Sequence, residues 1–336
     1  MRWSFLFVLV TMSCVDSENT QKHRFLLKGN EALTDQNYDQ ARQYFQEALK
    51  IDSCFVDALN NLGTSFFRQK SYAEALEFYN QAISCNPKFM DARFNRSNTF
   101  YELNRLPNAL QDVEAILLVK PDTLPVFFLQ GLIYTKMREY DRAEQSFLKI
   151  LKSDSLNAEI YVNLGTLSYY QKNYAESKRY LERSILLNPQ ESNGYNTRAL
   201  VEAAEGNLDV ALKYINQAIE LKPGDAYFKN NRGYVYLLKK EMTLALEDIN
   251  SSIASDPYNG WAYRNKGMYF IETKDYISAI RLLHQAVALE PFVERGYSLL
   301  AEAYHKSGDL KKACELWDVA KTNNEVVGNP TLFTCQ

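Results

Sequence analysis

Small residues and large apolar residues recur along this chain with a constant period of 34 residues, which is the sequence separation of Gly29 and Gly63. When repeats of this length are counted from Lys22, the eighth position always holds a small residue. These residues are Gly29, Gly63, Ser97, Gly131, Gly165, Ala199, Gly233, Gly267 and Ala301. A period that continues without insertion or deletion indicates a repeat architecture rather than one globular core.

The same period holds in the second half of each repeat. The seventeenth position carries a large apolar or aromatic side chain, namely Tyr38, Tyr72, Leu106, Tyr140, Tyr174, Leu208, Met242, Tyr276 or Leu310. The twentieth position carries Ala41, Ala75, Ala109, Ala143, Ser177, Ala211, Ala245, Ala279 or Ala313. We interpret each repeat as two short amphipathic helices, which the small residues allow to pack closely and whose junction the large residue fills. One such hairpin buries too little apolar surface to fold alone, so neighbouring hairpins must stack.

This pattern, with a proline near the end of most repeats, resembles the tetratricopeptide repeat. The resemblance implies an all-α, right-handed superhelical solenoid of nine helix-turn-helix repeats over residues 22–327. The repeats are expected at 22–55, 56–89, 90–123, 124–157, 158–191, 192–225, 226–259, 260–293 and 294–327. It also implies that the first helices line a concave face, which is the usual binding face of such arrays. The unbroken period favours one continuous solenoid over two domains.

Composition adds little to this picture beyond the partners that it excludes. Hydrophobic residues make up 46% of the chain, which is ample for a continuous core. The formal net charge is −3, and lysines and arginines alternate with acidic residues along the chain. This distribution lacks the basic patch that nucleic-acid binding requires, so we predict no nucleic-acid partner.

Enzyme and metal signatures are missing from the sequence. It contains no phosphate-binding glycine loop, zinc-protease motif or nucleophile elbow. His23, His284 and His305 fall on different repeats, and the cysteines lack metal-ligand or disulfide-framework spacing. We therefore predict no catalytic residue, no metal site and no cofactor, and we expect free thiols within the repeats. An enzyme with an unrecognised site is the alternative.

The N-terminus has the pattern of an export signal. Arg2 precedes an apolar run from Trp3 to Met12, which is too short to span a bilayer. A small residue before Cys14 resembles a bacterial lipoprotein signal, although Thr11 and Met12 depart from the usual pattern. We predict a signal over 1–13, lipidation of Cys14 and a tether over 14–21. The alternative is an ordinary secretory signal and a soluble periplasmic or secreted protein.

Two repeats share a polar substitution that predicts ion pairs inside their hairpins. Arg96 and Asp112 occupy the same two positions of their repeat as Arg232 and Asp248 occupy in theirs. These two positions face each other across the hairpin, and for partly exposed pairs we expect less than about 1 kcal/mol each. In the sixth repeat Glu202 replaces the usual aromatic residue, which predicts local looseness there.

Asparagine recurs on the predicted first helices. It occupies the sixth position of five repeats, with Leu129 and Leu299 at that position in two others. These residues are Asn61, Asn95, Asn163, Asn231 and Asn265. Asn60, Asn196 and Asn230 stand one position earlier. The series resembles the asparagine ladders of peptide-gripping superhelices, whose amides bind the backbone of an extended peptide. The alternative is that these amides satisfy local backbone groups.

Other predicted groove residues change character along the chain. Asp57, Asp91 and Glu159 make the N-terminal half acidic. The C-terminal half is aromatic and basic, with Tyr227, Tyr234, Trp261, Arg264, Met268 and Arg295. Tryptophan and arginine are common interface anchors, so Trp261 and Arg264 are the preferred candidates. Asn230, Tyr227 and Arg295 complete the candidate groove.

The sequence thus predicts a non-enzymatic scaffold that binds a protein or extended peptide and is anchored in a bacterial envelope. Its layout is similar to that of repeat lipoproteins that serve as assembly pilots and adaptors. The C-terminal tail, 328–336, is too short for a capping helix, and Val326, Val327, Leu332 and Phe333 could cover the last repeat. Self-association through that end, as a structural component of an envelope assembly, is the alternative function.

Overall fold

The computed structural model describes residues 4–291, 293–323 and 325, with side chains described from residue 18 onward. Helices account for 80% of this chain, and the described residues contain no strand. Each predicted repeat contains two helices, so the all-α repeat architecture is confirmed. The predicted tail residues 328–336 and the apolar residues proposed to cover the last repeat lie outside the described residues.

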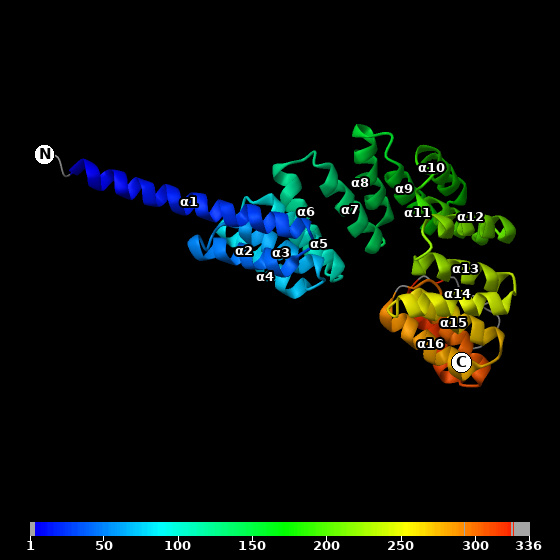
Figure 1. Ribbon diagram of the computed structural model, residues 1–336. Helices are drawn as coiled ribbons and strands as arrows, with labels where there is room; N and C mark the ends of the chain where they lie inside the picture. Colours follow the sequence, from blue (N-terminus) through cyan, green and yellow to red (C-terminus); the bar gives the residue numbers. More distant parts are fainter. Residues whose placement is uncertain (1–3, 292, 324, 326–336) are drawn as a thin grey trace. The chain divides into compact units, whose positions relative to one another are not determined.

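The hairpins group into two compact units, a division that the constant sequence period does not indicate. Unit 1 is Met1–Ser155 and unit 2 is Leu156–Gln336. Unit 1 contains α1 (Ser4–Thr34), α2 (Tyr38–Ile51), α3 (Val56–Arg68), α4 (Tyr72–Cys85), α5 (Met90–Glu102), α6 (Leu106–Val119), α7 (Leu124–Lys136) and α8 (Tyr140–Ser153), which are shown in Figure 1.

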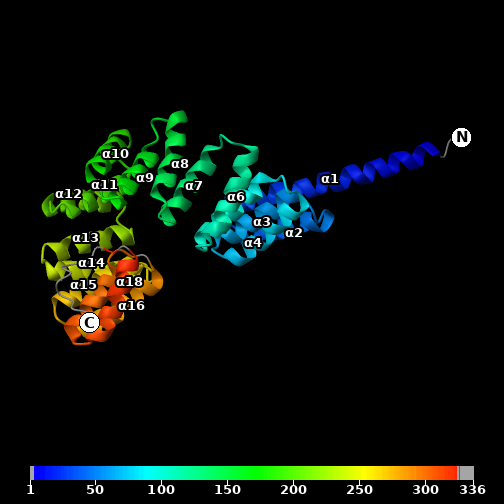
Figure 2. The ribbon, with the colours of Figure 1, turned by 180° about the vertical axis from the view of Figure 1, so that it is seen from behind.

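Unit 2 contains the remaining helices, and Figure 2 shows the hairpins from α13 to α16 lying one upon the next. They are α9 (Ala158–Tyr170), α10 (Tyr174–Leu187), α11 (Ser192–Ala204), α12 (Leu208–Leu221), α13 (Ala226–Leu238), α14 (Met242–Ser255), α15 (Gly260–Glu272), α16 (Tyr276–Leu289), α17 (Gly296–Ser307) and α18 (Leu310–Thr322).

The small residue at the eighth position makes the close helix packing that the sequence predicts. A Cβ atom added to Gly63 would lie 2.7 Å from Cε1 of Tyr79, and one added to Gly267 would lie 2.5 Å from Cγ of Leu283. Both partners are buried on the second helix of the same hairpin. Such distances leave no room for a side chain, so glycine is required where the opposing residue is large.

A left-handed residue ends the first helix of each repeat. The fifteenth position has a positive φ angle throughout, and most of these residues are not glycine. They are Gln36, Lys70, Asn104, Arg138, Lys172, Gly206, Lys240, Lys274 and Gly308. This conformation closes the last turn of a helix and starts the tight turn into the second helix.

A disulfide links neighbouring repeats in unit 1 and corrects the expectation of free thiols. Cys54 in the α2–α3 loop bonds Cys85 at the end of α4, with their Cα atoms 5.5 Å apart and a sequence separation of 31. Cys314 on α18 is also disulfide-bonded. The separation of Cys54 and Cys85 is close to one repeat, so stacking brings them together although no short-range spacing announces the pair.

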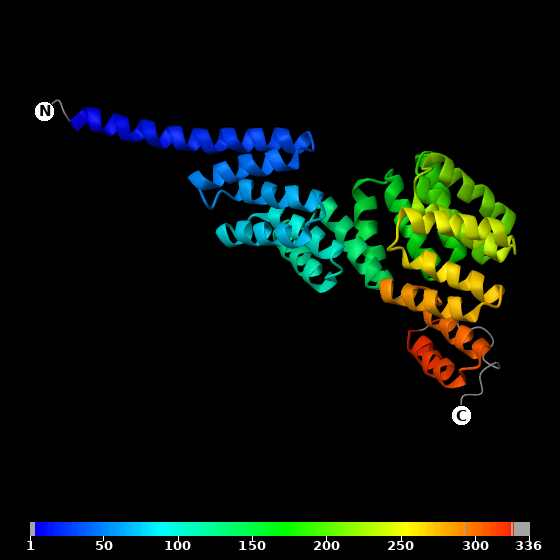
Figure 3. The same ribbon diagram turned by 60° about the horizontal axis from the view of Figure 1, so that its bottom comes forward.

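Two local predictions at the N-terminus and in the sixth repeat differ from the structure. The segment 14–21, predicted as a tether, continues α1, because it has neither glycine nor proline to end the helix. Figure 3 shows that α1 extends beyond its partner α2. Glu202 is 4% exposed and accepts hydrogen bonds from Nε of Arg198 at 2.9 Å and Nδ2 of Asn207 at 2.9 Å. These hydrogen bonds hold the end of α11 in position, so the prediction of local looseness in the sixth repeat is wrong.

Candidate functional site

The first helices of unit 2 form its inner layer. Each of them contacts the first helix of the next repeat: α9 contacts α11, α11 contacts α13, α13 contacts α15, and α15 contacts α17. Second helices of successive repeats do not approach one another as closely in the part of the chain that the structure describes. The layer of first helices is therefore the concave side of the stack, as the sequence predicts.

Asparagine side chains connect these first helices to one another. Nδ2 of Asn231 donates to Oδ1 of Asn196 at 2.8 Å, and Nδ2 of Asn265 donates to Oδ1 of Asn230 at 2.9 Å. Nδ2 of Asn230 reaches Oδ1 of Asn231 at 3.5 Å. We call this set, which runs from α11 through α13 to α15, the unit 2 ladder.

Unit 1 contains an equivalent ladder on α1, α3 and α5. Nδ2 of Asn61 donates to Oδ1 of Asn30 at 2.7 Å, and Nδ2 of Asn60 donates to Oδ1 of Asn61 at 3.0 Å. Nδ2 of Asn95 then donates to Oδ1 of Asn60 at 2.9 Å. Apart from the bond to Asn30, which stands at the ninth position of its repeat, both ladders join a fifth-position amide to the sixth-position amide of the next repeat.

Burial separates the predicted groove asparagines into two classes. Asn230 is 1% exposed and Asn265 is fully buried, so neither side chain can contact a partner in this arrangement. Asn61, Asn95 and Asn231 are half-buried within the ladders. Asn163 is half-buried and donates to the backbone carbonyl of Glu159 in its own helix at 2.9 Å, outside either ladder.

Arg264 ends the unit 2 ladder and is 5% exposed. Its Nε and Nη2 atoms donate to Oδ1 of Asn265 at 3.0 and 2.6 Å, and its Nη1 donates to the backbone carbonyl of Glu294 at 3.1 Å. The guanidinium carbon lies 5.0 Å from the ring centre of Tyr234 and 5.2 Å from that of Trp261. Burial, above all, lowers the pKa of Arg264, and the charge of Arg295 lowers it further.

Tyrosines from more distant helices share this environment. The ring of Tyr169 on α9 lies 6.2 Å from that of Tyr174 at the start of α10. Burial, and then the charge of Glu294, raise the pKa of both phenols, so both remain protonated donors at neutral pH. We call Tyr169, Tyr174, Tyr234, Trp261 and Arg264 the groove cluster.

The structure therefore brings together only part of the predicted C-terminal groove. Trp261, Arg264 and Tyr234 meet, and Arg295 lies half-buried at the start of α17. Tyr227 is 48% exposed, and the charges that act on its phenol are those of Asp256, Glu290 and Asp225. Sequence reasoning missed Tyr169 and Tyr174, because their repeat positions are also ordinary packing positions.

The two predicted ion pairs are confirmed, one in each unit. Nε and Nη2 of Arg96 donate to Asp112 at 2.7 and 2.6 Å, and the same atoms of Arg232 donate to Asp248 at 2.6 and 2.8 Å. Each arginine also donates through Nη1 to a neighbouring asparagine, either Asn80 or Asn216. The expected contribution to stability, less than about 1 kcal/mol for each pair, assumed that the pairs are partly exposed. It needs correction, because the Asp112 and Asp248 residues are only 1% and 7% exposed.

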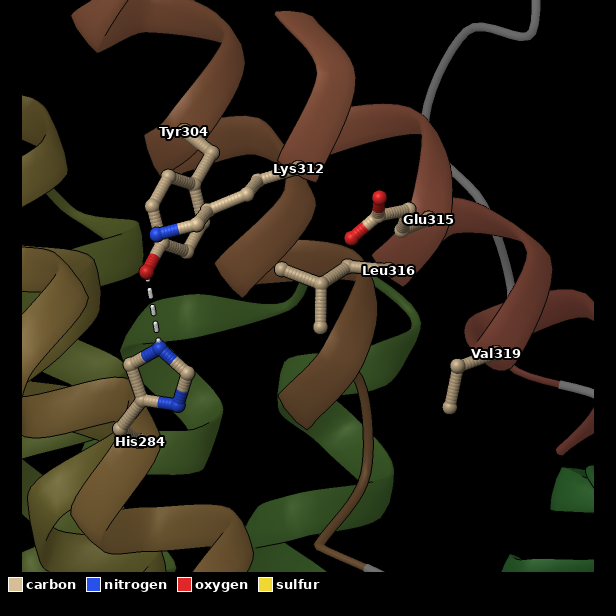
Figure 4. A pocket seen from close by; sticks show the side chains of 6 residues that line it. All are labelled: His284, Tyr304, Lys312, Glu315, Leu316 and Val319. Atoms are coloured by element: carbon tan, nitrogen blue, oxygen red, sulfur yellow. Dashed lines mark hydrogen bonds between the residues drawn. The ribbon is translucent and has the colours of Figure 1, made fainter. Parts of the chain in front are cut away.

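A second concavity lies on the last repeats, between α16 and α18. It is an open cleft of about 410 Å³ lined by His284, Tyr304, Lys312, Glu315, Leu316 and Val319, which are shown in Figure 4. Nε2 of His284 lies 3.0 Å from the phenolic oxygen of Tyr304, and the Lys312 amine lies 5.2 Å from that ring centre. Burial, and then the Lys312 charge, lower the pKa of His284, which is therefore neutral at pH 7.

The described residues contain no group of three or more histidine, cysteine, aspartate or glutamate side chains placed to hold a metal ion. No helix within them combines the length and the apolar character that crossing a membrane requires.

Comparison with known proteins identifies relatives of the fold. Family models described as tetratricopeptide repeat match residues 26–88, 124–155, 158–191 and 196–260. A tetratricopeptide repeat protein from Parabacteroides merdae is similar in structure, with 23% sequence identity, a TM-score of 0.68, and coverage of 75% of this chain and 99% of that chain. PilF of Pseudomonas aeruginosa is similar with 21% identity, a TM-score of 0.54, and coverage of 63% and 97%. A search of curated proteins found no match.

Proposed function

The chain belongs to the tetratricopeptide-repeat family, and on that premise we propose that it is a non-enzymatic scaffold that holds an extended segment of another polypeptide in the concave face of unit 2. Arrays of this kind generally serve protein interactions. The observation that carries the proposal lies in the groove cluster, where the rings of Tyr234 and Trp261 lie against the buried guanidinium of Arg264 on the inner helices. Large aromatic residues and arginine supply most of the binding energy at protein interfaces.

The ladder gives this surface a rigid support. Asn265 fixes the guanidinium of Arg264, which in turn lies against the rings of Tyr234 and Trp261. Side chains held in this way lose little conformational entropy when a partner binds, which favours affinity. In this proposal the buried asparagines support the binding surface, and the aromatic rings contact the partner.

A photo-crosslinking experiment tests where the partner binds. Benzoylphenylalanine placed at Trp261 is expected to crosslink one dominant polypeptide in cells of the source organism. The same residue at Ile277, which is 83% exposed on the second helix α16, is the matched control and should give no such product. Equal crosslinking at the two positions, or a product only at Ile277, would place binding outside the groove. A product that contains a second copy of this chain would instead support self-association.

We propose further that the chain acts in a bacterial envelope, anchored through Cys14. The apolar run that precedes Cys14 supports this localisation, and the Cys54–Cys85 disulfide adds independent support. Disulfides persist in oxidising compartments and are rare in the cytosol of most organisms. Signal cleavage before Cys14 remains a prediction.

Removal of the lipidated residue should release the protein from the membrane. We expect Cys14→Ser to move the protein from the membrane fraction into the soluble envelope fraction, because the lipid chain is then missing. Ser13→Ala, which keeps a small residue before the cysteine, should remain membrane-bound and is the control. Membrane retention of a processed Cys14→Ser protein would contradict lipid anchoring.

A further inference from the structure

The start of repeat 9 departs from the pattern of the other repeats. From repeat 2 to repeat 8 the first helix begins at the first position of its repeat, whereas α17 begins late, at Gly296. Arg295 precedes it with a φ angle of 60° and a ψ angle of 18°, in the left-handed region. Within the described chain, every other non-glycine residue with positive φ lies in a hairpin turn. Arg295 is therefore the one described non-glycine residue that takes this conformation outside a hairpin turn.

The segment before α17 is bonded to the groove cluster. The backbone carbonyl of Glu294 accepts a hydrogen bond from Nη1 of Arg264 at 3.1 Å, and Arg295 is the next residue. The late start of α17 therefore leaves Arg295 beside a guanidinium that is already buried. In the other repeats this position lies inside the first turn of the helix.

Neither arginine has a carboxylate partner among the residues that the structure describes. Within that part of the chain, Arg264 donates only to neutral oxygens, those of the Asn265 amide and the Glu294 backbone. Across the described side chains, no carboxylate forms an ion pair with Arg264 or Arg295, whereas Arg198 and Arg232, the other two arginines of unit 2 that are not exposed, each have one. The carboxylate of Glu325 lies at the same helix end, but it accepts from the backbone N–H groups of Tyr297 and Ser298 at 3.1 and 2.8 Å.

This arrangement is electrostatically incomplete. Two like charges in a partly desolvated site repel each other, and the aromatic faces of Tyr234 and Trp261 offset only part of that cost. Glu294 acts on Arg264 through its charge and Glu325 binds the backbone at the start of α17, but neither carboxylate forms an ion pair with Arg264 or Arg295 among the described residues. An anionic group from a partner would supply that ion pair, and the phenols of Tyr169 and Tyr174 are additional hydrogen-bond donors for it.

We propose that Arg295, beside the buried Arg264, receives an acidic side chain of the bound polypeptide and makes the unit 2 groove selective for acidic segments. The inference rests on the proposed function of that groove. Arg295 makes the contact, since it is half-buried and without an ion-pair partner among the described residues. Arg264 is a positioning residue. It holds the segment before α17 through its hydrogen bond to the Glu294 carbonyl, and its buried charge adds to that of Arg295.

Selection from a peptide library tests the proposal. The probe is a random library of dodecapeptides, acetylated and amidated at their ends so that only side chains carry carboxylates. Peptides retained by the full-length protein should be enriched in aspartate or glutamate at one position by about fivefold or more, the effect of one charge-assisted contact. Arg295→Gln should abolish that enrichment, because it keeps the length of the side chain approximately but removes the charge.

Two controls separate charge from folding. Arg295→Lys keeps the charge and should retain the acidic enrichment, and Arg281→Gln removes an exposed charge on α16 and should also retain it. Peptides selected without acidic enrichment, or an enrichment that survives Arg295→Gln, would overturn this inference while leaving polypeptide binding intact. If the protein retains no peptide better than its Trp261→Ala variant, the proposed function itself fails.

Discussion

Arg232→Met is expected to lower the free energy of unfolding by about 3 kcal/mol, because it leaves the Asp248 carboxylate buried without its partner. Asp248 is 7% exposed and accepts both of its short hydrogen bonds, at 2.6 and 2.8 Å, from Arg232. The measurement is urea denaturation followed by circular dichroism, with both midpoint and slope compared. A loss within about 1 kcal/mol would mean that the pair contributes no more than an exposed one.

The twin pair in unit 1 provides a graded comparison. Asp112 retains a second contact, from Nη1 of Arg93 at 3.3 Å, so Arg96→Met should destabilise less than Arg232→Met. Lys222 is exposed, and its partner Asp225 also accepts hydrogen bonds from two backbone N–H groups at the start of α13, so Lys222→Met should lose less than about 0.5 kcal/mol. The double variant Arg232→Met with Asp248→Leu should recover much of the loss, because no unpaired charge is then buried.

The positions of these pairs could be predicted from the sequence, but their strength could not. Two side chains at these positions of one repeat face each other across the hairpin, whatever the neighbouring repeats do. Whether the carboxylate is buried depends on how the next hairpin covers it. The sequence period locates every hairpin, but it does not say how tightly successive hairpins pack. For the same reason the division at Ser155 was not predicted.

Long-range pairing explains the other differences between sequence and structure. The recurrence of asparagine at one repeat position was evident, yet the bonding partners stand 35 residues apart, as with Asn230 and Asn265. Cys54 and Cys85 are likewise nearly one period apart. A search for polar or cysteine pairs separated by one period, plus or minus a few residues, would have found both. The groove cluster is harder to find, since Tyr169 and Arg264 come from helices three repeats apart, and the charge of Arg264 acts on Tyr169 only once the repeats have stacked.

The ladder also changes how the asparagines should be tested. A variant that removes Asn265 cannot report on partner binding alone, because that side chain is fully buried and bonded on both sides. Any loss of binding in such a variant would reflect the unfolding of α15 or a displacement of Trp261 as well as the loss of the asparagine itself. Residues whose loss leaves the ladder intact, such as Arg295, are the cleaner probes of the groove.

Asn265→Ala is accordingly expected to destabilise unit 2 by about 3 to 5 kcal/mol, the largest effect of any asparagine in the predicted series. The change removes the Oδ1 atom that accepts from Nε and Nη2 of Arg264, and leaves a buried guanidinium with the Glu294 carbonyl as its remaining bonded acceptor. It also removes the donor to Oδ1 of Asn230, which is 1% exposed. Urea denaturation followed by circular dichroism measures the loss.

Asn163→Ala is the matched control, because Asn163 occupies the same repeat position and lies outside the ladder. Its amide donates only to the Glu159 carbonyl in its own helix among the bonds described, so the loss should stay below about 1 kcal/mol. Asn265→Asp should restore part of the stability, since a carboxylate can accept both bonds from Arg264 but cannot donate to Asn230. Equal losses for Asn265→Ala and Asn163→Ala would mean that the ladder does not stabilise the stack. The asparagines would then again be candidates for direct contact with a partner.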